Sequence, residues 1–325
     1  MTLGVKARPA LLALVVLSLS ACAPTLKDLK PALSASESGV IPFATAGTLV
    51  RSADGARFVL GDPVIISGDL TFPAGTGPFP AVVLAHGCGG LGNAEAGWAP
   101  VLREWGYATF VIDSLRGRNL GEICTNATTL TGNQRIPDAY GALRIVSTHP
   151  RIDAGRVALM GFSHGAILTM GASTVWARQT FASAGKPAFR AFFAFYPYCN
   201  TVYPERERIS GPLRIHTGEL DDWTPAGPCA QLVEILKSHR QDAMITVYPG
   251  AHHSFDNLGL GRRFLYLPNV DSAAGCVFRA DSILEPLPLR KLPGCWRKGG
   301  TVAWNPEATE QARRNVQGQL AQLLK

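Results

Sequence analysis

The stretch Arg156–Met170, RVALMGFSHGAILTM, decides the fold of this chain. Apolar residues run up to Gly161, Gly-Phe-Ser-His-Gly follows, and a second apolar run begins at once. The first run is typical of a buried parallel strand and the second of a helix, so Ser163 falls at the turn between them. Gly161 and Gly165 flank it where a side chain would clash in so sharp a turn. The stretch therefore predicts a strand, a strained turn that exposes Ser163, and a helix.

A serine at such a turn can act as a nucleophile. Its hydroxyl is weakly nucleophilic near neutral pH, so it needs a base that accepts its proton and donors that stabilise the charge formed. The helix that begins after Ser163 directs free N–H groups toward that charge. Gly-x-Ser-x-Gly alone is a common pattern, and its position between a strand and a helix makes the prediction specific.

An acid and a histidine follow Ser163 in the chain order that this arrangement requires, each just after a later strand. The segment RIHTGELDDWTP ends one strand and then offers Asp221 and Asp222. The segment ITVYPGAHHSF ends another strand and then offers His252 and His253. One residue of each pair is expected to complete a catalytic triad with Ser163.

Strand patterns alternate with helical patterns along most of the chain. Strands are expected at 80–87, 107–114, 156–162, 189–197, 212–218 and 243–250, and helices at 98–106, 137–149, 229–239 and 306–325. This alternation predicts an α/β fold, with a doubly wound, mostly parallel sheet flanked by helices. Residues 46–72 are expected to form an antiparallel pair that begins the sheet. Asn305 is expected to cap the closing helix, with Pro306 in its first turn.

From about Gly61 to its end the chain resembles the dienelactone hydrolase family of the α/β-hydrolase fold. The resemblance is carried by FPAVVLAHGCGG, VIDSLRGR, RIPDAYGAL, RVALMGFSHG, TGELDDWTP and YPGAHHSFD. It implies that the acid is Asp221, in a Gly-x-x-Asp turn followed by proline, and that the base is His253, in a His-small-Phe turn. Family members named for the lactone reaction carry cysteine at the position of Ser163. The serine of this chain departs from that pattern, which puts a lactone substrate in doubt but not acyl-transfer chemistry.

The role of each group follows from acyl-transfer chemistry. His253 takes the proton of Ser163 and returns it to the leaving group, while Asp221 orients the ring and stabilises the imidazolium. The oxyanion hole is expected to combine the backbone N–H of His164 with that of Cys88, in the glycine-rich loop HGCGG.

Other side chains are candidates for the substrate pocket. Arg116 and Arg118 follow a strand at the same end of the sheet, and a guanidinium can bind a carboxylate through two hydrogen bonds. Solvated surface arginines are the more frequent case. Tyr196, Tyr198 and Trp223 are candidates to line an acyl or leaving-group pocket, although packing at strand ends would explain them equally well.

No metal ion or organic cofactor is expected. The adjacent His252 and His253 cannot easily turn both rings toward one ion, and no further ligand spacing supports a zinc site. Asp222 is expected to be solvated or to cap the next turn. The formal charge of +7 is spread along the chain, which disfavours nucleic acid as a partner.

The cysteines predict disulfides. Besides Cys22 the chain has an even number, which favours disulfides in an exported protein, with buried free thiols as the alternative. In the implied fold two pairs follow strands that end at the same sheet edge, which pairs Cys88 with Cys124 and Cys199 with Cys229. Cys276 and Cys295 are expected to staple a Pro- and Gly-rich excursion at 257–303.

The N-terminal residues 1–21 have the pattern of an export signal, because Lys6 and Arg8 precede an apolar run that ends in small residues. LSAC, residues 19–22, resembles the lipobox of bacterial lipoproteins, in which the cysteine is lipidated; an ordinary secretory signal is the alternative. Alanine after Cys22 favours the outer membrane, facing the periplasm. Anchoring through the lipid would make the membrane a partner.

Two segments are therefore expected after the signal. Residues 22–45 lack periodicity and predict a flexible tether, and residues 46–325 form one domain that contains the excursion. The expected function is a serine hydrolase that cleaves a small carboxylic ester or lactone through an acyl-enzyme on Ser163. A peptidase of the same fold and a non-catalytic envelope-binding lipoprotein are the alternatives.

Overall fold

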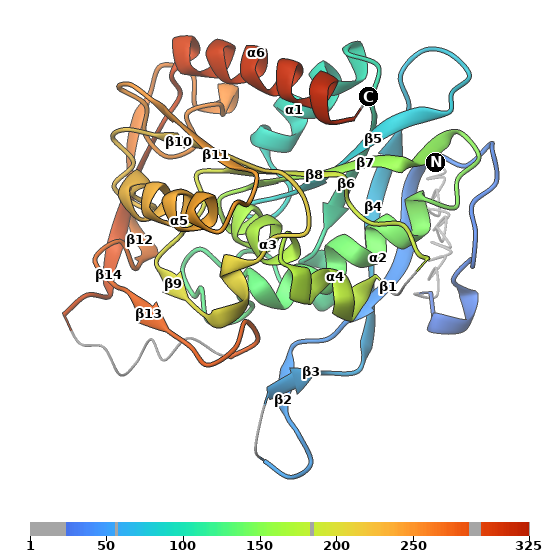
Figure 1. Ribbon diagram of the computed structural model, residues 1–325, viewed down its shortest axis with the longest axis horizontal. Coiled ribbons are helices and arrows are strands. Elements are labelled where there is room, and N and C mark those ends of the chain that lie inside the picture. The colour runs from blue at the N-terminus through green and yellow to red at the C-terminus, as the bar shows by residue number, and fades with distance from the viewer. Residues whose placement is uncertain (1–23, 56–57, 183–184, 286–293, 325) are drawn as a thin grey trace, which may run out of the picture.

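The computed structural model describes residues 24–55, 58–182, 185–285 and 294–324 (Figure 1). The expected export signal and Cys22 lie outside these residues. An eight-stranded sheet crosses the middle of the described chain in the order β1-β4-β6-β5-β7-β8-β10-β11. The described ranges contain no helix that is both long and apolar enough to cross a membrane.

The central sheet is mostly parallel, as the alternating pattern predicts. Its strands are β1 Gly39–Ala46, β4 Pro63–Thr71, β5 Phe79–Ala85, β6 Ala108–Asp113, β7 Ile152–Phe162, β8 Ala191–Phe195, β10 Leu213–Gly218 and β11 Ala243–Tyr248. The run from β6 to β11 is parallel, whereas β4 pairs antiparallel with β6 and with β1. The sequence AFFAF of β8 is buried at every position, which suits a strand covered by helices on both faces.

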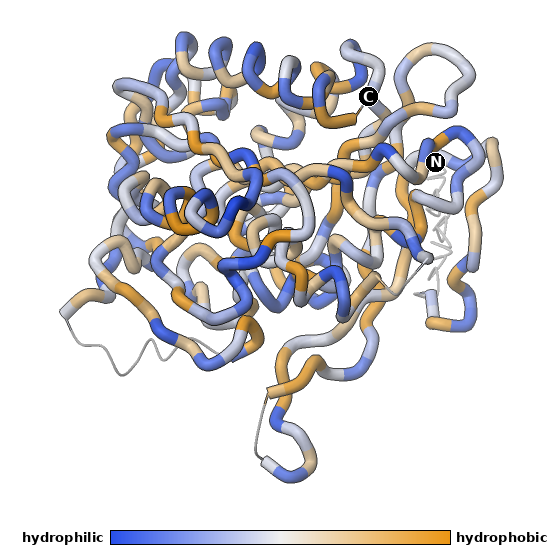
Figure 2. Tube along the Cα trace, viewed as in Figure 1, coloured by the Kyte–Doolittle hydropathy of each residue, from blue (hydrophilic) through white to orange (hydrophobic). Residues whose placement is uncertain are grey.

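Helices cover both faces of the sheet (Figure 1). One face holds α1 Asn93–Glu104 and α6 Pro306–Leu323, and the other holds α2 Ile136–Val146, α3 His164–Ala172, α4 Val175–Phe181 and α5 Ala226–Ser238. The tube of α6 alternates between hydrophilic and hydrophobic residues in Figure 2, and its buried side packs on the sheet. The Asn305 side chain accepts the Ala308 N–H at 3.0 Å, so α6 begins with the expected cap.

The expected flexible tether over 22–45 is wrong for the residues described. Its first part contains a short turn, η1 Leu26–Asp28, and its last part lies within β1. Alternate residues of β1 are buried against the sheet, among them Phe43, which is 4% exposed. Leu33 is also buried, and its N–H donates to the Thr148 hydroxyl at 3.0 Å. This segment is ordered because its apolar side chains complete the edge of the core.

The antiparallel pair expected over 46–72 is formed by β1 with β4, so it begins before residue 46. Between these strands the chain makes a small separate hairpin, β2 Leu49–Arg51 with β3 Phe58–Leu60, which projects from the body of the protein (Figure 1).

The described part of the excursion at 257–303 packs beside the carboxyl ends of the central strands. It contains η5 Leu258–Leu260, β12 Phe264–Ser272, β13 Phe278–Arg279 and β14 Arg297–Ala303. Strand β12 pairs with β14, and β13 pairs with β9 Thr201–Val202. The remaining short turns are η2 Arg116–Arg118, η3 Asn133–Arg135 and η4 Pro204–Glu207.

Three disulfides connect these loops, with the pairings expected from the sequence. They join Cys88 to Cys124, Cys199 to Cys229, and Cys276 to Cys295. The first bridges the loops that follow β5 and β6, and the second fixes α5 to the loop after β8. The third closes the excursion. The first two therefore join segments that the sheet brings together at one edge.

Candidate active site

Ser163 lies between β7 and α3 in a strained backbone conformation, with φ at 52° and ψ at −113°. A β-carbon on Gly161 would lie 2.0 Å from the Gly165 carbonyl oxygen, and one on Gly165 would lie 2.1 Å from the Ala85 carbonyl oxygen. Both contacts are with backbone atoms, so these positions have no room for a side chain. The turn is therefore as tight as the sequence predicts, and it presents the serine at its tip.

The structure brings together the three side chains expected to form a triad. The Ser163 hydroxyl lies 2.9 Å from His253 Nε2, and His253 Nδ1 lies 2.8 Å from Asp221 Oδ2. Asp221 follows β10 and His253 follows β11, so parallel strands deliver both to one sheet edge. His253 is 1% exposed and Asp221 is 4% exposed. With its Nδ1–H donating to Asp221, the ring leaves Nε2 free to accept the serine proton.

The Asp221 carboxylate is held by its own turn. Its Oδ1 accepts the backbone N–H groups of Trp223 at 3.0 Å and Thr224 at 2.7 Å. The Thr224 hydroxyl lies 2.9 Å from Asp221 Oδ2 and 3.0 Å from His253 Nδ1. These contacts fix the carboxylate and aim Oδ2 at the imidazole.

The His253 ring lies against two aromatic side chains. The Tyr196 ring is 4.7 Å from it and the Trp223 ring is 4.8 Å from it, measured between centroids. The Tyr196 hydroxyl donates to the buried Asp256 carboxylate at 2.8 Å, and the Trp98 indole N–H donates to the same carboxylate at 2.7 Å. Burial raises the pKa of Asp256 and raises that of Tyr196 well above its usual value. This network, which the sequence did not suggest, fixes the position of Tyr196 against the His253 ring.

The neighbours of the two triad residues have other contacts. Asp222 is exposed, as expected, and its carboxylate also accepts the backbone N–H and the hydroxyl of Thr301. These two hydrogen bonds connect the acid turn to β14. The His252 ring packs on Phe264, 4.9 Å away between centroids. Within the described residues, no group of three or more His, Cys, Asp or Glu side chains is arranged to hold a metal ion.

Backbone donors lie beside the serine at the expected oxyanion position. Cys88 and His164 both line the pocket that contains Ser163. Neither of their backbone N–H groups has a hydrogen-bond acceptor among the described residues, so both are available to a ligand. The Cys88 carbonyl accepts the Ile123 N–H at 2.9 Å, which, together with the disulfide, fixes the loop after β5. The arrangement suits an oxyanion hole, which remains a prediction.

A buried arginine, Arg135, for which the sequence suggested no role, supports the side chain of His164. Arg135 lies within the motif RIPDAYGAL and is fully buried. Its guanidinium donates to the His86 carbonyl at 3.0 Å and to His164 Nδ1 at 2.9 Å. Burial, together with the Arg135 charge, lowers the pKa of His164 to about 3, and burial lowers the pKa of Arg135 to about 10. His164 is therefore neutral near pH 7, while Arg135 keeps its charge.

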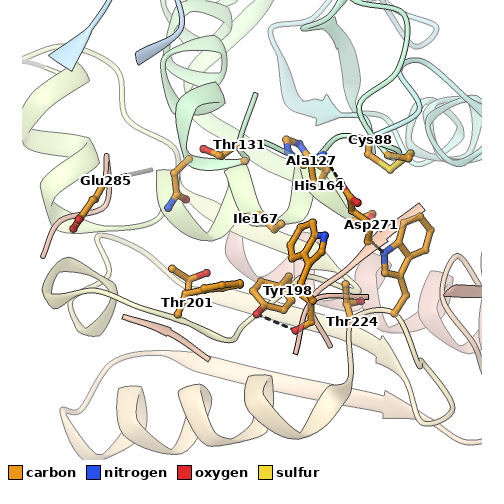
Figure 3. Close-up of a pocket in the computed structure, with 18 residues that line it drawn as sticks. Cys88, Ala127, Thr131, His164, Ile167, Tyr198, Thr201, Thr224, Asp271 and Glu285 are labelled. Carbon is orange, nitrogen blue, oxygen red and sulfur yellow. Dashed lines mark hydrogen bonds between the residues drawn. A yellow bond between two sulfur atoms is a disulfide. The ribbon is translucent and has the colours of Figure 1, made fainter. Parts of the chain in front are cut away.

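A cavity of about 110 Å³ opens beside Ser163 (Figure 3). Trp223 and Tyr198 line it, as expected, and Ile167, Phe278 and Trp296 add apolar surface. The Trp223 indole N–H donates to the Asp271 carbonyl at 2.8 Å, and the Tyr198 hydroxyl donates to the Cys276 carbonyl at 2.9 Å. Both polar groups are thus satisfied by the excursion, which leaves ring surface facing the cavity.

Three residues expected at the pocket lie elsewhere. Arg118 is buried in an ion pair with Asp138 on α2, 2.7 Å away, because a buried carboxylate without a partner would be strongly unfavourable. The Arg116 side chain is 86% exposed and lies 3.7 Å from Asp113. Tyr196 packs behind the histidine instead of facing the cavity. None of the three therefore lines the cavity beside Ser163.

Comparisons with known proteins agree with the fold and identify the family. A sequence model of the dienelactone hydrolase family matches residues 66–261. A probable 2-oxo-3-(5-oxofuran-2-ylidene)propanoate lactonase from Bradyrhizobium sp. is 24% identical over 204 residues, which cover 57% of this chain and 77% of that protein. Esterase EstD from Thermotoga maritima is 33% identical over 109 residues, which cover 32% of this chain and 26% of the esterase.

Solved structures show the same fold. A dienelactone hydrolase-like promiscuous phosphotriesterase, P91, from metagenomic libraries has a TM-score of 0.59 and 17% identity, covering 88% of this chain and 100% of that one. A putative dienelactone hydrolase from Klebsiella pneumoniae has a TM-score of 0.55 and 15% identity, covering 87% and 99% of the two chains.

Proposed function

Since this chain belongs to the dienelactone hydrolase family and is a carboxylic ester hydrolase, we propose that it cleaves its substrate through an acyl-enzyme on Ser163. The proposal assigns the base to His253, the acid to Asp221, and the oxyanion hole to the backbone N–H groups of Cys88 and His164. The substrate is a small ester or lactone.

In the first half of the reaction Ser163 Oγ attacks the carbonyl carbon while its proton moves to His253 Nε2. The carbonyl oxygen becomes an oxyanion that accepts the two backbone N–H groups. Asp221 accepts the Nδ1–H of the imidazolium and stabilises its charge. When the C–O bond breaks, His253 Nε2 gives its proton to the departing alkoxide oxygen, and the acyl group stays on Ser163.

In the second half a water molecule replaces the alcohol. His253 Nε2 takes one proton from the water as its oxygen attacks the acyl carbon. The second tetrahedral species collapses, the Ser163 oxygen leaves, and it recovers a proton from His253. Carboxylic acid and free enzyme result.

The single observation that carries this proposal is the continuous chain of contacts from Ser163 through His253 to Asp221, at 2.9 and 2.8 Å. A serine, a base and an acid in this order are the groups that acyl transfer needs.

The proposal is tested by labelling the protein with a fluorophosphonate, mapping the modified residue, and measuring turnover of 4-nitrophenyl esters of increasing acyl length. We expect the label on Ser163, and we expect Ser163→Ala to lose both labelling and turnover. Ser238→Ala, an exposed serine at the end of α5, is the matched control and should keep both. Labelling of another residue, or equal turnover by Ser163→Ala, would reject the proposal.

We propose further that the protein is anchored in the bacterial cell envelope through a lipid on Cys22, facing the periplasm. The charged, apolar and small-residue pattern of residues 1–22 supports this location. Radioactive palmitate should label the wild-type protein in cells and should fail to label Cys22→Ala. Labelling of both proteins, or of neither, would contradict the anchor.

A further inference from the structure

Among the described residues, the charged side chains that line the pocket beside Ser163 are acidic. Its described lining residues include Asp271 and Glu285 and include neither lysine nor arginine. Figure 3 places Glu285 at one end of the cavity and Asp271 at the other. The cavity therefore has an acidic residue at each end and aromatic or aliphatic side chains between them.

Two cations of the described chain that contact lining residues of this pocket, Lys298 and Arg135, are committed to other partners. Lys298 is paired with Asp271 and also donates to the Thr125 carbonyl at 2.8 Å. Arg135 lies behind His164 and donates to the ring, so its charge is separated from the cavity by a neutral imidazole. Neither side chain lines the cavity. Neither can reach a substrate carboxylate there without breaking its own contacts.

The two carboxylates differ in how freely they act on a substrate. Asp271 is covered, accepts the Ala127 N–H at 2.9 Å, and is largely neutralised by Lys298. Glu285 is exposed, and it accepts the backbone N–H of Asp281 at 2.6 Å. Among the described residues no cation pairs with Glu285, so no salt bridge neutralises its charge.

The middle of the cavity is apolar and small. Tyr198 and Phe278 belong to a buried cluster against which Ile167 and Trp296 pack. An engineered apolar cavity of about 150 Å³ holds one benzene molecule. The 110 Å³ found here therefore suits a short acyl chain or a group no larger than a small ring.

We propose that this pocket selects uncharged esters with a small apolar group and discriminates against substrates that carry a carboxylate. This inference rests on the proposed function, because it concerns the same site. A carboxylate that enters the cavity loses water without gaining a cationic partner among the described lining residues, and it is repelled by Glu285. Selection for neutral esters follows from both effects.

The test compares matched ester pairs that differ only in one charge. On the acyl side, 4-nitrophenyl valerate is compared with mono-4-nitrophenyl glutarate, in which a carboxylate replaces the terminal methyl group. On the alcohol side, methyl 4-acetoxybenzoate is compared with 4-acetoxybenzoate. After the uncatalysed rate of each ester is subtracted, we expect kcat/KM to be at least about tenfold lower for the charged member of at least one pair. Values within threefold in both pairs would overturn the inference.

Charge reversal at Glu285 shows whether this pocket causes the discrimination between charged and neutral esters. Glu285→Lys should reduce the discrimination in the affected pair several-fold. The matched control is Glu310→Lys, which makes the same charge change at an exposed position on α6, on the opposite face of the sheet. The control should leave the ratio between charged and neutral esters unchanged. An unchanged ratio in Glu285→Lys, or an equal change in both variants, would overturn the inference.

The two proposals fail in different ways. If no ester is turned over and the fluorophosphonate does not label Ser163, the proposed function is rejected. If both members of each pair are turned over equally through Ser163, the proposed function stands and only the inference about charge is rejected.

Discussion

Asp222 accepts the backbone N–H of Thr301 at 2.8 Å and its hydroxyl at 2.7 Å. The preceding residue, Asp221, instead accepts from His253. Two adjacent carboxylates on one turn therefore have separate tasks. Asp221 orients the imidazole, and Asp222 ties the turn to β14 in the excursion.

This difference predicts that the same substitution mainly affects kcat at Asp221 and mainly affects stability at Asp222. Asp221→Asn should lower kcat for a 4-nitrophenyl ester by about 10³- to 10⁴-fold, because the amide no longer stabilises the required tautomer and the imidazolium. Asp222→Asn should keep kcat within about threefold and lower the free energy of unfolding by about 1 kcal/mol. Steady-state kinetics and urea unfolding measure both. A loss of kcat in Asp222→Asn as large as that in Asp221→Asn would contradict the assignment.

The turn around Ser163 predicts that Gly165 cannot be replaced. A β-carbon there would lie 2.1 Å from the Ala85 carbonyl oxygen, and neither backbone segment can move without disturbing the sheet. Gly165→Ala should lower the free energy of unfolding by about 3 kcal/mol or more. The control is Gly318→Ala on α6, where nothing lies within 4 Å and a gain of roughly 0.5 to 1 kcal/mol is expected. Equal stability of the two variants in urea would show that the turn is not tight.

Two of the disulfides should differ in their effect on catalysis. Cys88–Cys124 closes 36 residues and Cys199–Cys229 closes 30, so replacing either pair by alanine should lower the free energy of unfolding by a similar 3 to 4 kcal/mol, roughly. Only the first holds the loop that carries an expected oxyanion donor. Loss of Cys88–Cys124 should lower kcat by about tenfold, which is less than the effect of removing an oxyanion-hole donor outright. Loss of Cys199–Cys229 should leave kcat within twofold. Equal kcat values for both variants would argue against an oxyanion role of that loop.

The stability of the protein should depend on the ionisation of Glu95. This side chain is 3% exposed in α1, and burial raises its pKa from 4.5 to about 7. The folded state therefore holds the proton more tightly than the unfolded state, and the free energy of unfolding falls as the pH rises from 4.5 through 7. The loss is complete above pH 7 and amounts to at most about 3 kcal/mol.

Glu95→Gln removes this dependence, because the amide cannot ionise and can still accept the Gly92 N–H that Glu95 accepts at 2.9 Å. Urea unfolding at pH 5 and pH 8 measures the difference in stability between the two proteins. We expect the free energy of unfolding of the variant to rise relative to that of the wild type as the pH rises. A difference that is the same at both pH values would show that Glu95 does not titrate in this range.

The sequence by itself determined the sheet, the turn at Ser163 and the disulfide pairing. These features depend on patterns that act over short distances or on strand order. Gly161 and Gly165 indicate the turn because only glycine fits there, and apolar runs indicate the buried strands. Because parallel strands end at one edge, chain order also placed Asp221 and His253 on the side of Ser163, and the structure brings the three within hydrogen-bond distance.

Only the tertiary structure decided which charged residues face the pocket. Arg118 was expected at its mouth and is instead buried against Asp138, whereas Glu285 reaches the cavity from the excursion. Nor did the sequence disclose that Arg135 supports His164. The physical reason is that the environment of a charge depends on which distant segments cover it. A buried charge must find a partner, and that partner is fixed by packing between elements rather than by neighbours along the chain.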